Sequence, residues 1–134
     1  MRDDIENRMN EYQLDAIIAL GSGIDTTFSY FTRGVLVRDS LVLYRREEQG
    51  AILIWETDRK KAAASGMRVM IFDSEIYRDA IGKTQDQNQA LLQLYLHHLR
   101  LLGLSGRVSF IGQNDIHIAY QLVSQVEKSF LSPW

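Results

Sequence analysis

The three histidines are the first candidates for metal or acid–base chemistry, because an imidazole can ligate a metal ion or transfer a proton near neutral pH. His97 and His98 are adjacent in a stretch with helical periodicity, so their side chains diverge by about 100° and cannot share a metal ion from one helix face. On a helical wheel His98 falls on the apolar face, which predicts a packed neutral ring, whereas His97 falls on the polar face. His117 falls on the polar side of the last predicted helix. No carboxylate–histidine cluster has zinc-type spacing, and we expect no catalytic metal on this chain.

A glycine pair around Ser22 follows an apolar run and precedes a predicted helical turn, where a phosphate-binding loop would lie. A dinucleotide-binding fingerprint requires a third glycine three residues later, and position 26 is a threonine. Ser22 has no histidine nearby in sequence that would activate it as a nucleophile. We therefore interpret this segment as a chain reversal.

The expected order of strands resembles the ribonuclease H-like fold, which raises the hypothesis of a nuclease, and the positions of the aspartates test it. Two-metal nucleases require carboxylates along the first strand and on the neighbouring helix and strand. Here the interior of the first strand is apolar, and only Asp15 and Asp73 lie at strand edges, with Asp58 at a helix start. We expect these acids to face solvent or to cap helix ends.

The composition is that of a soluble globular protein, and we expect one domain over 1–134. Hydrophobic residues make up 46% and charged residues 24%, and the net charge of −2 is spread along the chain, which does not fit a basic nucleic-acid binder. No apolar run approaches the roughly 20 residues of a membrane span, and the polar first 11 residues do not resemble a signal segment. Cysteine is absent, so we expect no disulfide or thiolate site and a cytoplasmic location.

The elements that would position these residues follow from apolar periodicity and turn residues. The run over 15–20 is typical of a strand buried on both faces. Helices are expected over 3–12, 58–65 with Thr57 as cap, 87–102, and from Asn114 to a last apolar residue at Phe130. The segment 75–86 predicts one helical turn at most, because Gly82 weakens a longer helix. Further strands are expected over 40–45, 51–55, 68–72 and 107–111.

The strongest helix, over 87–102, has a broad apolar face. That face is expected to comprise Leu91, Leu92, Leu94, Tyr95, Leu99, Leu101 and Leu102. A short polar loop between the second and third strands predicts an antiparallel hairpin, and helical connections predict parallel strands. The fold class is therefore α/β, a five-stranded mixed sheet with the hairpin at one edge and helices on both faces.

The stretch 14–34 contains one recognisable motif, which reads Leu-Asp-Ala and an apolar run over 14–20, then Tyr-Phe-Thr-Arg-Gly over 30–34. This motif resembles the amino-terminal domain of the creatinase, prolidase and aminopeptidase P family, the pita-bread metallopeptidases. In that family Leu-Asp-Ala and a hydrophobic run lead through a loop to Tyr-hydrophobic-Thr-Gly. Arg33 is inserted relative to this pattern, and Thr27 stands where the family usually has Asn or Asp. Beyond this motif, the expected order of helices and strands is similar to that of the family domain over essentially the whole chain.

The resemblance implies a ribonuclease H-like motif of the creatinase/prolidase amino-terminal type and a chain that is not catalytic by itself. The parent would be an Xaa-Pro dipeptidase, aminopeptidase or creatinase-like hydrolase that acts on a peptide or a related small molecule. Its pair of divalent metal ions (manganese, cobalt or zinc) would lie in a carboxy-terminal catalytic domain absent from these 134 residues. The present domain would help to form a homodimer and to gate the active site, with Thr27, Tyr30 and Arg33 facing the substrate.

Two other hypotheses remain open from the residues alone. The first is a free-standing small-molecule-binding or protein-interaction module, for which a ligand is expected outside the carboxyl ends of the parallel strands, near 21–25 and Asp73. An independent hydrolase would require metal-dependent turnover by 1–134 alone, which we do not expect. Neither nucleic acid nor a membrane is an expected partner.

Overall fold

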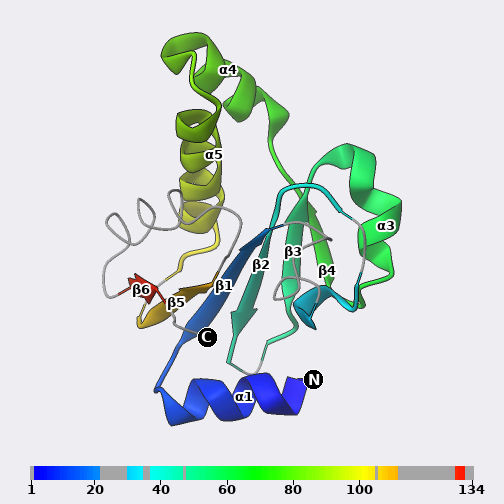
Figure 1. Cartoon of the computed structure of the whole chain (residues 1–134), viewed down its shortest axis with the longest axis vertical. Coiled ribbons are helices and arrows are strands. Elements are labelled where there is room, and N and C mark those ends of the chain that lie inside the picture. The colour runs from blue at the N-terminus through cyan, green and yellow to red at the C-terminus, as the bar shows by residue number, and fades with distance from the viewer. Residues whose placement is uncertain are drawn as a thin grey trace.

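The computed structural model describes residues 2–21, 30–34, 37–46, 48–104, 106–111 and 129–131. Six strands in these ranges form one sheet in the order β4-β3-β2-β1-β5-β6 (Figure 1). The strands are β1 (Ala16–Gly21), β2 (Ser40–Arg45), β3 (Ala51–Ile54), β4 (Arg68–Ile71), β5 (Val108–Ile111) and β6 (Ser129–Leu131). The helices are α1 (Arg2–Glu11), the 3₁₀ helix η1 (Glu56–Asp58), α3 (Arg59–Ala63), α4 (Ser74–Thr84) and α5 (Gln87–Leu101).

The strand directions place most carboxyl ends at one edge of the sheet. Strand β2 pairs antiparallel with both β1 and β3, whereas the pairs β3–β4, β1–β5 and β5–β6 are parallel. It follows that β2 runs opposite to the other strands of the described sheet. The ends of β1, β3, β4 and β5 therefore meet at the edge where β2 begins, which we call the carboxyl edge.

Helices cover both faces of the sheet, as predicted. On one face α5 packs its leucines against alternate strand residues such as Ile18 and Phe110. On the other face α1 contributes Ile5 and Met9, and α3 contributes Ala62. Because both faces are covered, β1 is buried along its whole length, which explains its uninterrupted apolar sequence.

The mixed α/β sheet and the β2–β3 hairpin are confirmed, but the position of the hairpin and the number of strands are corrected. The hairpin lies inside the sheet, because β2 also pairs with β1 and β3 also pairs with β4. Phe130, expected on a helix, belongs to β6, where it lies opposite Ser109 of β5. Residues 112–128, with Asn114 and His117, are outside the described part of the chain.

Two helices differ from their predicted form. Helix α4 has 11 residues rather than one turn, because Asp73 caps it by accepting the Glu75 N–H at 3.0 Å and because it packs along α5. Thr57 does not cap the next helix; it lies in η1, and Asp58 occupies the cap position of α3 without a side-chain cap bond. Leu101, expected on the apolar face of α5, is 71% exposed, whereas its neighbour Leu102 packs against the core.

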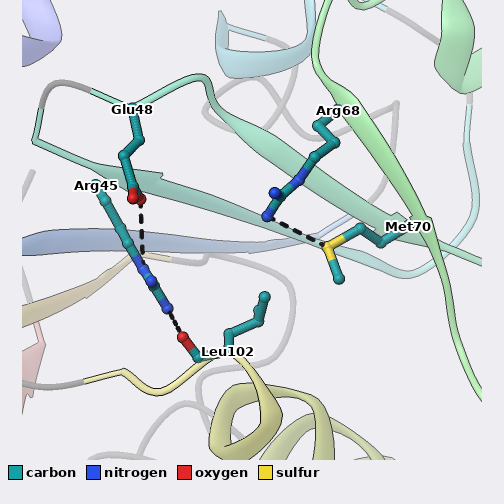
Figure 2. A network of polar contacts seen from close by, with 5 residues as sticks. All are labelled: Arg45, Glu48, Arg68, Met70 and Leu102. Atoms are coloured by element: carbon teal, nitrogen blue, oxygen red, sulfur yellow. Dashed lines mark hydrogen bonds and ion pairs between the residues drawn. The ribbon is translucent and has the colours of Figure 1, made fainter.

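Two adjacent arginines attach the end of β2 to a helix on each face. Arg45 donates to the carbonyl of Leu102, the C-cap of α5, and its Nε lies 3.9 Å from Glu48 Oε2 (Figure 2). Arg46 donates to the carbonyls of Met9, at 3.1 Å, and Leu14, at 2.5 Å, near the end of α1. Arg45 ends β2 and Arg46 directly follows it, and their hydrogen bonds reach helices on opposite faces of the sheet. Cations at the carboxyl ends of helices also interact favourably with the helix dipole.

None of the helices in the described ranges has the length and apolar character needed to cross a membrane.

Candidate functional site

A cleft of about 480 Å³ opens at the carboxyl edge, where β3 and β4 end. We call it the Trp55 cleft. Its lining combines residues that follow β3, residues at the end of β4 and one residue that precedes β2: Trp55, Glu56, Thr57, Ile71, Phe72, Ser74 and Arg38. Three segments that are distant in sequence thus meet at the edge where open α/β sheets bind ligands.

A buried carboxylate holds Arg38 in place. Asp58 is only 3% exposed, and its Oδ2 accepts the backbone N–H of Arg38 at 2.8 Å. The hydroxyl of Ser40 donates to the Arg38 carbonyl at 2.5 Å. Both polar groups of the Arg38 backbone are therefore bonded, which fixes the segment that enters β2 beside the cleft.

An aromatic cluster forms the apolar wall of the cleft. The ring centroid of Trp55 lies 5.2 Å from that of Phe72 and 5.2 Å from that of Tyr77 on α4. Phe72 in turn packs against Tyr95 of α5, at 5.7 Å. Edge-to-face and tilted rings at these distances attract one another beyond the burial of their area, so the wall is held by contacts to two helices.

The chain segment between β4 and α4 is also bonded to α5. The Asp73 N–H donates to Nε2 of His98 at 3.0 Å, and the His98 ring lies 5.5 Å from that of Phe72. Burial, and next the charge of His97, hold the pKa of His98 below its usual value, while Asp73 acts in the opposite direction. His98 is therefore packed and neutral near pH 7, as its place on the helical wheel predicted.

The groups in the cleft can bind a ligand that is partly apolar and partly polar. Trp55 and Phe72 supply apolar surface, Thr57 and Ser74 supply hydroxyls, and Arg38 supplies a guanidinium. Glu56 is bonded by both Nε and Nη2 of Arg59, at 2.9 and 2.8 Å. Hydrogen bonding to Arg59 holds the pKa of Glu56 below its usual range.

Tyr30 and Arg33, two of the three residues predicted to face a substrate, are not among the residues that line this cleft. Thr27 lies outside the described part of the chain. Tyr30 is 46% exposed and donates to Asp4 of α1 at 3.4 Å; desolvation and the charge of Asp4 raise its pKa. Arg33 is exposed, has a left-handed backbone with φ of 59°, and places its guanidinium beside Gly66, which precedes β4. Tyr30 and Arg33 thus lie with α1 and the α3–β4 turn.

The three aspartates weighed for nuclease chemistry are engaged with backbone amides. Asp15 accepts the Arg107 N–H at 2.7 Å, Asp58 accepts that of Arg38, and Asp73 accepts that of Glu75. Across the ranges that the structure describes, no three His, Cys, Asp or Glu side chains come close enough to hold a metal ion.

A smaller hollow of about 320 Å³ lies at the opposite edge of the sheet, between Asp15, Arg45 and Gly106. Gly106 is required there because its φ is +85° and because a Cβ would lie 2.2 Å from Asp15 Oδ2. This close approach allows Asp15 to bind the chain entering β5. We interpret this hollow as part of the framework.

The comparisons with known proteins agree with the fold. No family model and no curated protein matches the sequence. Among solved structures, a Creatine_N superfamily domain of a dipeptidase from Streptococcus thermophilus is similar, with a TM-score of 0.56 and 16% sequence identity. The alignment covers 97% of this chain and 89% of that chain. This chain has the fold of that domain.

The Trp55 cleft lies at the edge of the sheet where a ligand is expected if the chain is a free-standing module, but the sequence did not predict the residues that line it. Asp73, one of the two expected ligand positions, lies between the lining residues Phe72 and Ser74. Arg38 and Trp55 were missed, because neither belongs to a recognisable motif. A usable signal was available for Trp55, since it directly follows a buried strand that runs parallel to its neighbour.

Proposed function

We propose that this chain is a non-catalytic domain of an Xaa-Pro dipeptidase- or aminopeptidase-like metallopeptidase. In the whole protein it contributes to a homodimer and gates an active site that a carboxy-terminal catalytic domain supplies. The observation that carries this proposal is the likeness, along 97% of the chain, to a domain of a dipeptidase. The Leu-Asp-Ala and Tyr-Phe-Thr-Arg-Gly motif supports it independently. The substrate is a peptide, and the expected compartment is the cytoplasm.

The carboxyl edge is the surface that we assign to the catalytic domain. Tryptophan and arginine are the residues most often found at the centre of energetically important contacts, and Trp55 and Arg38 lie at this edge. Thr27, Tyr30 and Arg33 remain the predicted substrate-facing residues. The exposed side chains of Tyr30 and Arg33 are available to a second subunit.

The proposal is tested in the protein encoded by the natural reading frame. We expect Trp55→Ala to lower kcat/KM for an Xaa-Pro dipeptide by about tenfold, equivalent to ~1.4 kcal/mol of transition-state binding. The matched control is Tyr12→Ala, which removes an exposed ring on the α1 side of the molecule. An equal loss in both variants, or none in Trp55→Ala, would contradict a gating role for this edge.

A second candidate is a free-standing small-molecule-binding module, and the Trp55 cleft favours it. Its volume of about 480 Å³ is that of a site for a small ligand. A thermal-shift screen with dipeptides, guanidino acids and nucleotides separates the two candidates. A shift in the wild-type chain that disappears in Trp55→Ala would favour the binding module.

A further inference from the structure

His98 links helix α5 to the segment that follows strand β4. It belongs to α5, is 8% exposed, and accepts the N–H of Asp73 at 3.0 Å. Asp73 lies in the short segment 72–74 that joins β4 to α4, and Phe72 and Ser74 on either side of it line the Trp55 cleft. The hydrogen bond therefore fastens one wall of the cleft to the helical layer.

This hydrogen bond requires the neutral ring. An acceptor nitrogen has a free lone pair, so the proton of the neutral imidazole is on Nδ1. Protonation of Nε2 would set an N–H against the N–H of Asp73, and the bond would be lost. The new imidazolium would also remain against the Phe72 ring in a nearly closed site.

Asp73 offers the charged ring a different partner. Its carboxylate now accepts the Glu75 N–H and caps α4, and its charge favours protonation of His98. A protonated His98 attracts this carboxylate away from the cap, because a charge-assisted bond is stronger than a neutral one. The same proton thus weakens both the hydrogen bond between Asp73 and His98 and the amino-terminal cap of α4. Helix α4 lies beyond the sheet and packs against α5 (Figure 1).

We propose that His98 is a proton-operated latch: when it is neutral it holds the 72–74 segment closed on α5, and when it is charged it releases that segment and opens the wall of the Trp55 cleft. This inference goes beyond the proposed function and does not depend on it. Within the described residues, the charged and titratable groups that act on His98 are His97 on α5 and Asp73 on the released segment. Burial and His97 move the transition to pH values below the usual histidine range.

The experiment follows backbone amide resonances by NMR from pH 7.5 towards pH 4.5 while the His98 ring is titrated. The amide signals of Asp73 and Glu75 are expected to shift together with the apparent pKa of the His98 ring. In Trp134→Phe protein, where Trp55 is the one remaining tryptophan of the sequence, its fluorescence is expected to change over the same pH interval.

Two variants complete the test. His98→Gln places a non-titrating acceptor where Nε2 lies, so the shifts of Asp73 and Glu75 should be absent over this interval. His97→Gln is the matched control, which keeps the latch and moves its transition to higher pH because a neighbouring positive charge is removed. The proposal is overturned if Asp73 and Glu75 do not respond while His98 titrates, if His98→Gln responds as the wild type does, or if all amide signals are lost together at one pH.

Discussion

The most informative individual residues are those whose environment differs from what their position in the sequence indicated. His98 was placed correctly, because its burial follows from the periodicity of one helix. Asp58 was expected at a helix end, yet it is buried and binds the backbone of Arg38, 20 residues earlier in the chain. Helical periodicity carries no information about such a contact, since Arg38 lies in an irregular segment before β2 and Asp58 ends the short 3₁₀ helix η1.

Asp58→Ala is expected to destabilise the chain by about 1–3 kcal/mol, because the N–H of Arg38 would lose its buried acceptor. Asp58→Asn is the matched control, since an amide oxygen in the same place still accepts this hydrogen bond. Urea denaturation gives both free energies of unfolding. A cost as large for asparagine as for alanine would show that the charge, rather than the acceptor, stabilises this segment.

Thr32→Val is expected to leave stability unchanged or to raise it by up to about 1 kcal/mol. Thr32 is fully buried, and within the described ranges its Oγ1 is a side-chain oxygen that lacks a hydrogen-bond partner. Valine has nearly the same shape without the hydroxyl. A clear loss of stability in thermal and chemical denaturation would contradict this description of the site.

The pH dependence of stability should contain a contribution from His98. Because its pKa is lowered in the folded state, the unfolded chain takes up the proton first as the pH falls below the ordinary value of 6.5. The free energy of unfolding should therefore fall between that value and the lower pKa of the folded state, by at most about 1.4 kcal/mol per pH unit. His98→Gln should lack this contribution, which urea denaturation at several pH values measures. Parallel curves for the two proteins would refute it.

At the level of elements, the strands were predicted more accurately than their arrangement. Apolar runs located five strands within one or two residues, and in β1 and β3, which are buried along their whole length, the run contains no polar residue. The neighbours of the hairpin and the strand β6 were not predicted, since pairing depends on which edges meet in space. Helix α4 is longer than predicted, because its packing on α5 outweighs the low helix propensity of Gly82.

Gly82→Ala is expected to stabilise the chain by roughly 0.5–1 kcal/mol, because glycine is a poor residue within a helix. A Cβ at Gly82 would meet nothing within 4 Å. The matched control is Gly103→Ala, where the space is equally open but φ is +64°, so alanine should cost about 1 kcal/mol. Thermal unfolding of both variants tests this. Equal effects at the two positions would show that φ does not decide the outcome.

For the molecule as a whole, fold and function could be predicted from the sequence to different degrees. The α/β class followed from patterns that any chain with this fold must satisfy. The Trp55 cleft could not be predicted in this way, because three segments distant in sequence form it and the order of the strands in the sheet brings them together. The proposed role rests on a likeness of fold together with one short motif, so it must be tested on the whole protein.

The central claim is that these 134 residues form a domain that serves chemistry performed by residues elsewhere in the protein. The most direct measurement is hydrolysis of an Xaa-Pro dipeptide, with added manganese, cobalt or zinc, by the product of the natural reading frame and by residues 1–134 alone. We predict turnover by the first and none by the second. Metal-dependent cleavage by residues 1–134 alone, or a reading frame that encodes no catalytic domain, would contradict the claim.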